Sequence, residues 1–277
     1  MNRILTTITP CWGRKDILTR WLQCLEFARD PRVSHLVIFV GEPVPDWVGD
    51  RYKSDPCFRF VSFPQDVPGQ LSIGHYHNWA SKECDTEWIM KLDVDALPNE
   101  FYFTALVPLL VQAEVREWFN GGMLYLTPSL TSSLFQTRSS VTPEFYGAVL
   151  EDLKNSTETP HSPAASNFIC RRQDYLNLGG CDPRFRGYGW EDYQQLYMLE
   201  RHRLGKCPFE RNIHLRNITQ RCRDELSRRK AQQLWQHSKW LCLLHHWHPK
   251  LHSGNYRSSA NIENNRRVLF DYCRAHG

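Results

Sequence analysis

Short, continuous runs of apolar residues alternate along this chain with segments in which apolar residues recur every three or four positions. Continuous runs of about four to eight apolar residues are typical of buried strands, and the wider spacing is typical of amphipathic helices. Residues 15–27 show the helical spacing, with Ile17, Trp21 and Leu25 on one side. Strands that alternate with helices in this way indicate an α/β fold with parallel strands at the centre of its sheet.

This pattern places the expected elements along most of the chain. Strands are predicted at residues 4–9, 36–40, 58–63, 88–92, 118–126 and 167–171. Helices are predicted at residues 15–27, 72–84, 100–117, 144–154, 191–203 and 224–244. Residues 129–165 are rich in Ser, Thr and Pro, and we expect a loop there that contains the helix at 144–154. One continuous domain over 1–277, with a boundary near residue 130, is the expected organisation.

Composition narrows the class of protein. Of the 277 residues, 41% are hydrophobic and 23% are charged, an ordinary globular mixture, and a net charge of +4 is too small to indicate nucleic-acid binding. Basic residues gather over 211–239, which indicates either a solvated helix face or contact with an anionic membrane surface or substrate. Ten cysteines without a C-x-x-C pair argue against a zinc ribbon. No signal peptide and no membrane-spanning apolar run are visible, so we expect a cytoplasmic protein.

The segment KLDVDALP, residues 91–98, carries the strongest chemical signal. Asp93 and Asp95 follow directly after the apolar strand predicted at 88–92. Two carboxylates at the carboxyl end of a strand suit a divalent cation, and such a cation suits a diphosphate. The alternative is that the pair caps a turn, because D-x-D is common.

Two further segments carry weaker signals, one at the end of the first predicted strand and one ahead of the strand that leads to the aspartates. Pro10 ends the first strand and Arg14 precedes the first helix, at the edge of the sheet where α/β proteins bind ligands. An arginine there suits a phosphate or a base edge, although a plain turn accounts for the residues equally well. In GHYHNWA, residues 74–80, Asn78 and the histidines either contact a nucleotide or lie in the helix surface and core, and the second is the more common case.

The segment GGCDPRFRGYGWED, residues 179–192, combines four glycines with an acid pair. Glycine permits tight turns and close approach to a ligand. Glu191 and Asp192 then open a helix, whose N-terminus favours an ionised carboxylate suited to a general base. The alternative is an acidic first turn that stabilises only its own helix. Tyr188 and Trp190, directly before the acids, favour the functional interpretation.

A histidine cluster follows near the C-terminus, in HHWHP at residues 245–249. His245 and His248 are three residues apart, so on a helical turn they point to one side and suit a metal ion. Zinc held by several histidines is one option, and Mn²⁺ or Mg²⁺ held together with Asp95 is another. Surface histidines after a helix are the alternative.

Together these segments resemble the metal-dependent glycosyltransferases of the GT-A fold, especially the inverting β-1,4-galactosyltransferase and chondroitin-polymerase-like group. The resemblance runs from the first strand to His248. It implies a GT-A (Rossmann-like) α/β fold with a mixed, mostly parallel central sheet flanked by helices. It also implies that Pro10 and Arg14 contact the uridine nucleotide, that Asp93 lies near the ribose or diphosphate, and that Asp95 binds the metal.

The same resemblance implies roles for residues in the second half of the chain. Asp192 falls on the catalytic base and Glu191 on the residue that holds the acceptor sugar, while His245 and His248 fall on metal ligands. Tyr188 and Trp190 are expected to contact the acceptor, although both depart from the usual residues of the family. Residues 1–128 are then the nucleotide-sugar-binding half, and 129–277 the acceptor-binding and catalytic half.

The implied function is metal-dependent, inverting transfer of a hexose or N-acetylhexosamine, with a galactose-type sugar favoured, from a UDP-sugar. The acceptor is expected to be a glycan or a lipid-linked glycan of a bacterial surface polysaccharide, with Mn²⁺ or Mg²⁺ as cofactor. The enzyme is expected in the cytoplasm, with peripheral membrane contact through 211–239 as an option. Two alternatives remain: a sugar nucleotidyltransferase, which the loop after the first strand matches poorly, and a non-catalytic carbohydrate-binding relative.

Overall fold

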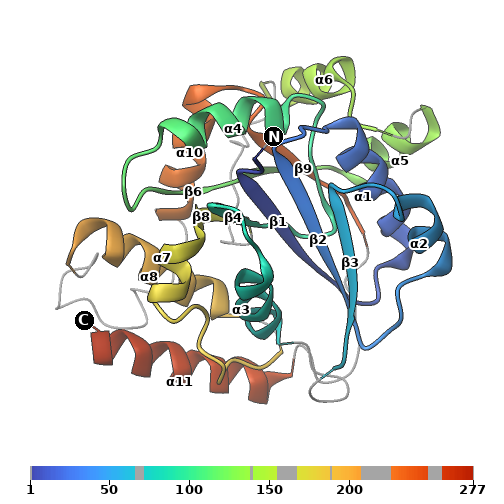
Figure 1. Ribbon diagram of the computed structural model, residues 1–277. Coiled ribbons are helices and arrows are strands. Elements are labelled where there is room, and N and C mark those ends of the chain that lie inside the picture. Colours follow the sequence, from blue (N-terminus) through green and yellow to red (C-terminus); the bar gives the residue numbers. More distant parts are fainter. Residues whose placement is uncertain are drawn as a thin grey trace.

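The computed structural model describes residues 2–65, 72–137, 140–154, 167–187, 189–206, 226–248 and 258–276. A six-stranded sheet runs through the molecule in the order β3-β2-β1-β4-β8-β6 (Figure 1). Its strands are β1 (Leu5–Cys11), β2 (Val33–Val40), β3 (Phe58–Phe63), β4 (Trp88–Lys91), β6 (Trp118–Asn120) and β8 (Phe168–Arg171). The first four are parallel, and β8 runs antiparallel to both β4 and β6. The expected class, a mixed and mostly parallel α/β sheet flanked by helices, is confirmed.

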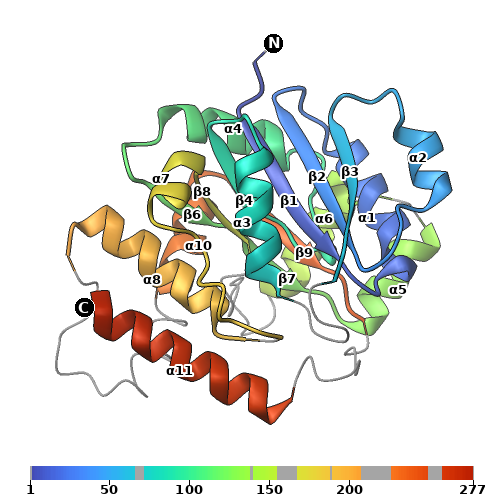
Figure 2. The same ribbon diagram turned by 60° about the horizontal axis from the view of Figure 1, so that its bottom comes forward.

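Helices cover both faces of this sheet (Figures 1 and 2). They are α1 (Lys15–Phe27), α2 (Asp46–Tyr52), α3 (Ile73–Glu83), α4 (Tyr102–Gln112), α5 (Pro128–Thr137), α6 (Pro143–Lys154), α7 (Arg172–Asn177), α8 (Glu191–Leu204), α10 (Ser227–His237) and α11 (Ser259–His276). Alternate residues of β2 enter different cores, since Val37 packs with α1 and α4 while Ile38 packs with α3 and α8. Burial on both faces explains why the central strands are almost continuously apolar.

A second, three-stranded sheet has the order β5-β9-β7. It consists of β5 (Ala96–Leu97), β7 (Gly122–Tyr125) and β9 (Cys242–His245). The single strand predicted at 118–126 is therefore wrong, because it divides at Gly121 into β6 of the large sheet and β7 of the small one. A Cβ at Gly121 would lie 3.0 Å from Tyr102 Oη, so the chain changes sheets where only a glycine fits without displacing a neighbour.

The prediction of one helix at 224–244 is also wrong over its second half. Helix α10 ends at His237, Ser238 is extended with φ −161° and ψ 134°, and Cys242–His245 forms β9. Residues 224 and 225 lie outside the described part. Strand β9 pairs with β5 on one side and β7 on the other, so its neighbours in space decide its conformation.

Smaller differences concern the ends and number of the helices. The helix predicted at 100–117 ends at Gln112, after which Ala113 is extended. Helix α5 lies in the stretch expected to be a loop, and α2, α7 and α11 were not predicted. Figures 1 and 2 both place α11 alongside α8. Within the residues that the structure describes, no helix combines the length and apolar character that a membrane span requires.

Candidate active site

One carboxylate and two imidazoles form a compact cluster. Ligand atoms of Asp95, His245 and His248 all lie within 4.8 Å of one another. Asp95 Oδ2 is 2.8 Å from His248 Nε2 and 3.8 Å from His245 Nε2. One carboxylate oxygen with two imidazole nitrogens is a donor set that fits Mn²⁺ and leaves positions open for a ligand. Two segments 150 residues apart in the sequence therefore build one candidate metal centre.

Backbone pairing brings these segments together. Strand β5 runs antiparallel to β9 with Ala96 opposite His245, and the His246 N–H donates to the Asp95 carbonyl at 2.8 Å. Asn99 Nδ2 donates to the Trp240 carbonyl at 2.8 Å and holds the start of the same strand. The expectation of a helical turn at the histidines is wrong. His245 ends a strand, and the irregular segment 246–248 returns His248 to Asp95.

The charges of the cluster suit metal binding. Burial alone would raise the pKa of Asp95, but its hydrogen bond with His248 and the nearby charges of His245 and Arg14 hold the pKa below its usual value. Burial lowers the pKa of His245 by more than the charge of Asp95 raises it, and nearby His248 lowers it further. At neutral pH Asp95 is therefore ionised and His245 is neutral, and these are the forms that bind a metal ion.

The acid pair opens helix α8. Trp190 precedes it in the left-handed region at φ 75°, and Gly189 has φ 94°. Such angles are rare for side-chain-bearing residues, so the backbone before the acids is tightly constrained. Asp192 Oδ1 accepts a hydrogen bond from Lys91 Nζ at 2.5 Å, which places the acid pair beside the strand that leads to Asp95.

Helix α11 holds the loop that precedes the acids. Asn265 is fully buried, and its Nδ2 donates to the carbonyls of Arg186 at 2.6 Å and Gly189 at 3.0 Å. Its Oδ1 accepts the Arg186 N–H at 2.8 Å. One amide side chain thus fixes the backbone on both sides of the short segment that leads into Trp190.

Asn78 holds the glycine-rich segment at its other end. Its Nδ2 donates to the Cys181 carbonyl at 2.7 Å, and its Oδ1 accepts the Cys181 N–H at 2.9 Å and the Tyr175 hydroxyl at 2.9 Å. Gly180, at φ 67°, has no room for a Cβ, which would lie 2.3 Å from Asn78 Oδ1. Within 74–80, Asn78 therefore positions the segment before the acid pair. Nothing in the sequence of this segment distinguishes Asn78 from its neighbours.

The remaining predicted residues take different positions. Pro10 lies in β1 opposite Ile38, and Arg14 precedes α1, close enough for its charge to act on Asp95. The Asp93 N–H donates to Asn167 Oδ1 at 3.3 Å. The Trp190 ring packs against Tyr193 with centroids 5.5 Å apart. Tyr188 lies outside the described residues.

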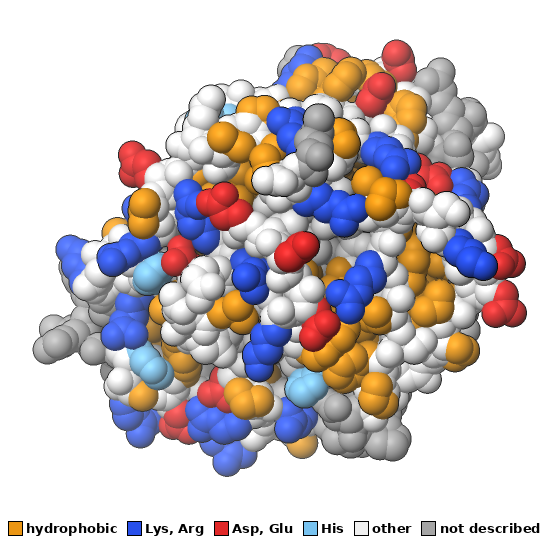
Figure 3. Space-filling model, viewed as in Figure 1, with side chains coloured by type: hydrophobic (Ala, Val, Ile, Leu, Met, Phe, Trp, Pro, Cys, Tyr) orange, Lys and Arg blue, Asp and Glu red, His pale blue; other side chains and the backbone are white. Residues whose placement is uncertain are grey.

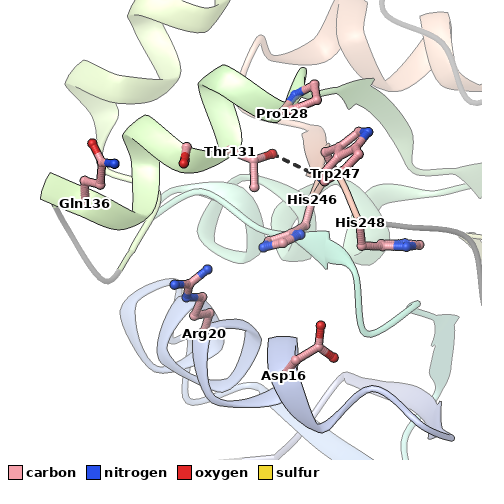
Figure 4. Close-up of a pocket in the computed structure, with 9 residues that line it drawn as sticks. Asp16, Arg20, Pro128, Thr131, Gln136, His246, Trp247 and His248 are labelled. Atoms are coloured by element: carbon pink, nitrogen blue, oxygen red, sulfur yellow. Dashed lines mark hydrogen bonds between the residues drawn. The ribbon is translucent and has the colours of Figure 1, made fainter.

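A cavity of about 310 Å³ borders the metal cluster (Figure 4). Helix α1 contributes Asp16 and Arg20, helix α5 contributes Thr131, and the segment after β9 contributes Trp247 and His248. The backbone N–H of Trp247 donates to Thr131 Oγ1 at 3.1 Å, while Trp247 as a whole is 44% exposed. His248 belongs to both the cavity wall and the cluster, so the cavity and the candidate metal centre adjoin at this residue.

A family model matches most of the chain. Residues 58–265, more than half of the chain, match the glycosyltransferase-like family 2. The chain belongs to that family. The match includes both aspartates, the acid pair and both histidines, and it begins after Pro10 and Arg14. The expectation of a glycosyltransferase is thereby confirmed at the level of the family, while the galactosyltransferase and chondroitin-polymerase-like group remains a prediction.

Several solved glycosyltransferase structures are similar to this family 2 chain at low identity. They include the mannosyltransferase PcManGT from Pyrobaculum calidifontis, with GDP-Man and Mn²⁺ (14% identity, TM-score 0.46, 100% of this chain and 76% of that one). Glucosyl-3-phosphoglycerate synthase from Mycobacterium tuberculosis, with Mn²⁺, UDP-Glc and phosphoglyceric acid, is another (17%, 0.46, 80% and 79%). Staphylococcus aureus TarS is a third (12%, 0.47, 72% and 34%). The chain spans 54% of the TarS 1–349 fragment. No match was found among curated proteins.

The basic segment 211–239 of this glycosyltransferase is described only from residue 226 onward. Two of its cations bind carboxylates of the protein itself. Arg229 Nη2 donates to Glu200 Oε1 at 2.6 Å, and Lys230 pairs with Glu117. On the face seen in Figure 3, Lys and Arg are interleaved with Asp and Glu. These two residues thus have a structural role, and residues 211–225 lie outside the described part.

Proposed function

We propose that the protein is a metal-dependent, inverting glycosyltransferase that moves a hexose or N-acetylhexosamine from a UDP-sugar to a glycan or lipid-linked glycan. One observation carries the proposal. The five-residue segment 91–95 contacts the acid pair at one end, through Lys91 and Asp192, and the two histidines at the other, through Asp95. A candidate base and a candidate metal centre therefore adjoin one short stretch of chain.

Asp95, His245 and His248 would hold Mn²⁺ or Mg²⁺. A bound divalent cation supplies charge neutralisation to the diphosphate of the departing UDP. On the donor side, Pro10 and Arg14 are proposed to contact the nucleotide, and Asp93 the ribose or diphosphate. The cavity beside His248 has room for the part of the donor that adjoins the diphosphate, at the same edge of the sheet.

Asp192 is the proposed base. It removes the proton from an acceptor hydroxyl, whose oxygen forms a new bond to the anomeric carbon as the bond from that carbon to the diphosphate breaks. Attack from the opposite face inverts the configuration. Burial and the charge of Asp192 raise the pKa of Glu191 well above its usual range, so Glu191 is protonated at neutral pH and donates a hydrogen bond to the acceptor. Trp190 and Tyr188 are proposed acceptor contacts.

The proposed setting is the synthesis of a bacterial surface polysaccharide in the cytoplasm, with a galactose-type donor favoured. This finer assignment rests on the resemblance described above. Residues 1–128 would hold the nucleotide sugar, and 129–277 would supply the acceptor site and the base.

A panel of UDP-sugars with Mn²⁺ tests the proposal, with released UDP as the measured product. We expect release with at least one donor, loss of release on chelation, and loss in Asp95→Ala and Asp192→Asn. His276→Ala, an exposed histidine on α11, is the control and retains activity. Pyrophosphate as the product would indicate a nucleotidyltransferase, and a metal-dependent thermal shift without turnover on any acceptor would indicate a non-catalytic relative.

A further inference from the structure

Lys91 joins the strand that carries the aspartates to the helix that carries the acid pair. It is the last residue of β4, its side chain is 2% exposed, and its Nζ donates to Asp192 Oδ1 at 2.5 Å. The Asp192 side chain is 19% exposed. Asp192 thus contacts a buried cation while part of it still faces solvent, which is where an acceptor hydroxyl must arrive.

Burial of the Lys91 ammonium group at this position costs free energy. A buried ammonium group loses its hydration, and a buried ion pair is often no more stabilising than apolar residues of similar volume. The other residues of β4, Trp88, Ile89 and Met90, are apolar and buried, so the sheet would accept another apolar side chain at position 91. The stability of the sheet therefore does not account for Lys91, whereas its effect on the neighbouring carboxyl groups does.

Three carboxyl groups act on Lys91. Burial alone would lower the pKa of its ammonium group, but Asp192, Asp93 and Glu191 together raise that pKa above its ordinary value. Lys91 therefore remains a cation throughout the range of pH in which an enzyme works. A fixed positive charge favours the ionised form of the carboxylate that it contacts.

Asp93 adds a negative charge that raises the pKa of Glu191, whereas two other titratable groups near Lys91 and the acid pair are uncharged at neutral pH. Burial raises the pKa of the Cys181 thiol, which lies near both acids, and lowers the pKa of the His77 imidazole, which lies near Lys91. Glu191 is 4% exposed, and its Oε2 has no hydrogen-bond partner within the described residues. One cation thus faces two adjacent acids, of which it contacts only Asp192.

We propose that Lys91 is a positioning residue that holds one oxygen of Asp192, leaves the other oxygen for the acceptor hydroxyl, and thereby makes Asp192, and not Glu191, the base. This inference rests on the proposed function. Asp192 Oδ1 is bound to Lys91, so Oδ2 is the oxygen that receives the proton from the acceptor hydroxyl. The charge of Lys91 therefore sets the pH above which the base is ready, in addition to the orientation of the base.

The decisive variant is Lys91→Met, which keeps the length of the side chain and removes its charge. Loss of an opposite charge in contact with a carboxylate raises the pH at which that carboxylate ionises by about 1–3 units. We expect the acid limb of kcat/KM to move to higher pH by about that amount. Below the wild-type acid limb this corresponds to a loss of about 10-fold to 1,000-fold, which diminishes as the pH rises, while KM for the UDP-sugar changes little.

Two other variants separate the charge effect from a general loss of structure. Lys91→Arg keeps the charge, so its acid limb should stay near the wild-type position. Lys230→Met removes another buried lysine, 3% exposed and paired with Glu117, that lies outside the proposed site. It should lower the melting temperature without moving the pH profile. If Lys91→Met folds and its acid limb coincides with that of the wild type, the proposal is wrong.

A measurement on the wild-type protein decides the question even if Lys91→Met does not fold. Carboxyl ¹³C NMR follows the ionisation of each acid, with Asp192 identified by the signal missing in Asp192→Asn and Glu191 by the signal missing in Glu191→Gln. Asp192 must ionise at lower pH than Glu191, and the reverse order overturns the proposal. If the wild type turns over and the pH profile of Lys91→Met is unmoved, the role of Lys91 is refuted while the proposed function stands. Absence of turnover with every donor refutes the function, and the titration still settles the order of the two acids.

Discussion

Asn265 offers the sharpest test of how the fold orients the acid pair. The perturbation is Asn265→Ala, which removes two hydrogen bonds donated to the carbonyls of Arg186 and Gly189 and one accepted from the Arg186 N–H. Each lost hydrogen bond costs about 1 kcal/mol, and more where the abandoned group stays buried. We therefore expect a loss of about 3 kcal/mol in the free energy of unfolding.

That loss translates into a measurable change in melting temperature. An unfolding entropy of about 2.1 cal/mol/K per residue gives about 0.6 kcal/mol/K for 277 residues, so 3 kcal/mol lowers the melting temperature by about 5 °C. The segment 186–189 leads directly into Trp190 and the acids, so its displacement should also misplace the base. A misplacement of about 1 Å costs about 100-fold in rate, and we expect that loss in kcat.

The assay compares Asn265→Ala with Asn264→Ala. Asn264 is the preceding residue of the same helix, and its Nδ2 makes only long contacts, at 3.4 Å to the Arg184 carbonyl and 3.5 Å to Asn265 Oδ1. Thermal unfolding, kcat for UDP release and Mn²⁺ affinity are measured for both. We expect Asn264→Ala to resemble the wild type and Asn265→Ala to lose stability and kcat with unchanged Mn²⁺ affinity. Equal melting temperatures and equal kcat for the two variants would refute the reasoning.

Three further predictions concern separate parts of the structure. His248→Ala should abolish the Mn²⁺-dependent rise in melting temperature, because it removes one of the three cluster ligands, and a full rise in this variant would exclude His248 as a ligand. Burial lowers the pKa of His35 to about 3. The unfolded state accepts a proton at this residue below about pH 6.5, whereas the folded state does not. The free energy of unfolding therefore falls as the pH falls through about 6.5. His35→Gln should therefore reduce the loss of unfolding free energy between pH 7.5 and pH 5.5 by about 1.4 kcal/mol, measured by denaturant titration; an unchanged loss contradicts this. Gly74→Ala should destabilise the protein because its Cβ would lie 2.1 Å from Cys181 Sγ, whereas Gly147→Ala in α6 has nothing within 4 Å and should leave the melting temperature unchanged or raise it.

The local pattern of apolar residues predicts the structure correctly where the conformation of a segment depends on its own sequence. The strand at Phe58–Phe63 and the helix at Lys15–Phe27 have the predicted bounds, since their apolar spacing fits one period only. The run Cys242–His245 shows the limit of this reasoning. Four residues after a helix fit either a last helical turn or a short strand. The partners that decide for a strand, Ala96–Leu97 and Gly122–Tyr125, lie more than a hundred residues away.

The candidate site likewise contains residues that the local sequence reveals and residues that only the fold reveals. Asp95 and Asp192 were visible because they are unusual residues at the ends of predicted elements. Asn265 was not, because it lies among other polar residues of α11 and differs from Asn264 only in its burial and its partners. Lys91 was invisible for a related reason. A lysine at a strand end ordinarily faces solvent, and only the arrival of α8 from a hundred residues later turns it into a buried partner of an acid.

The short segment from Lys91 to Asp95 also sets the size of the proposed reaction site. Lys91 is fixed by its pairing with Ile8, and Asp95 is fixed by the hydrogen bond of its carbonyl to the His246 N–H. Four residue steps at about 3.3–3.6 Å each limit the Cα separation of the two ends to about 14 Å. The proposed base beside Lys91 and a metal ion held by Asp95 would therefore stay within this distance of each other. A sugar linked to a diphosphate must bridge the distance between the proposed base and the proposed metal centre. Insertion of a single residue after Asp93 should therefore abolish transfer even where every ligand and the base are retained.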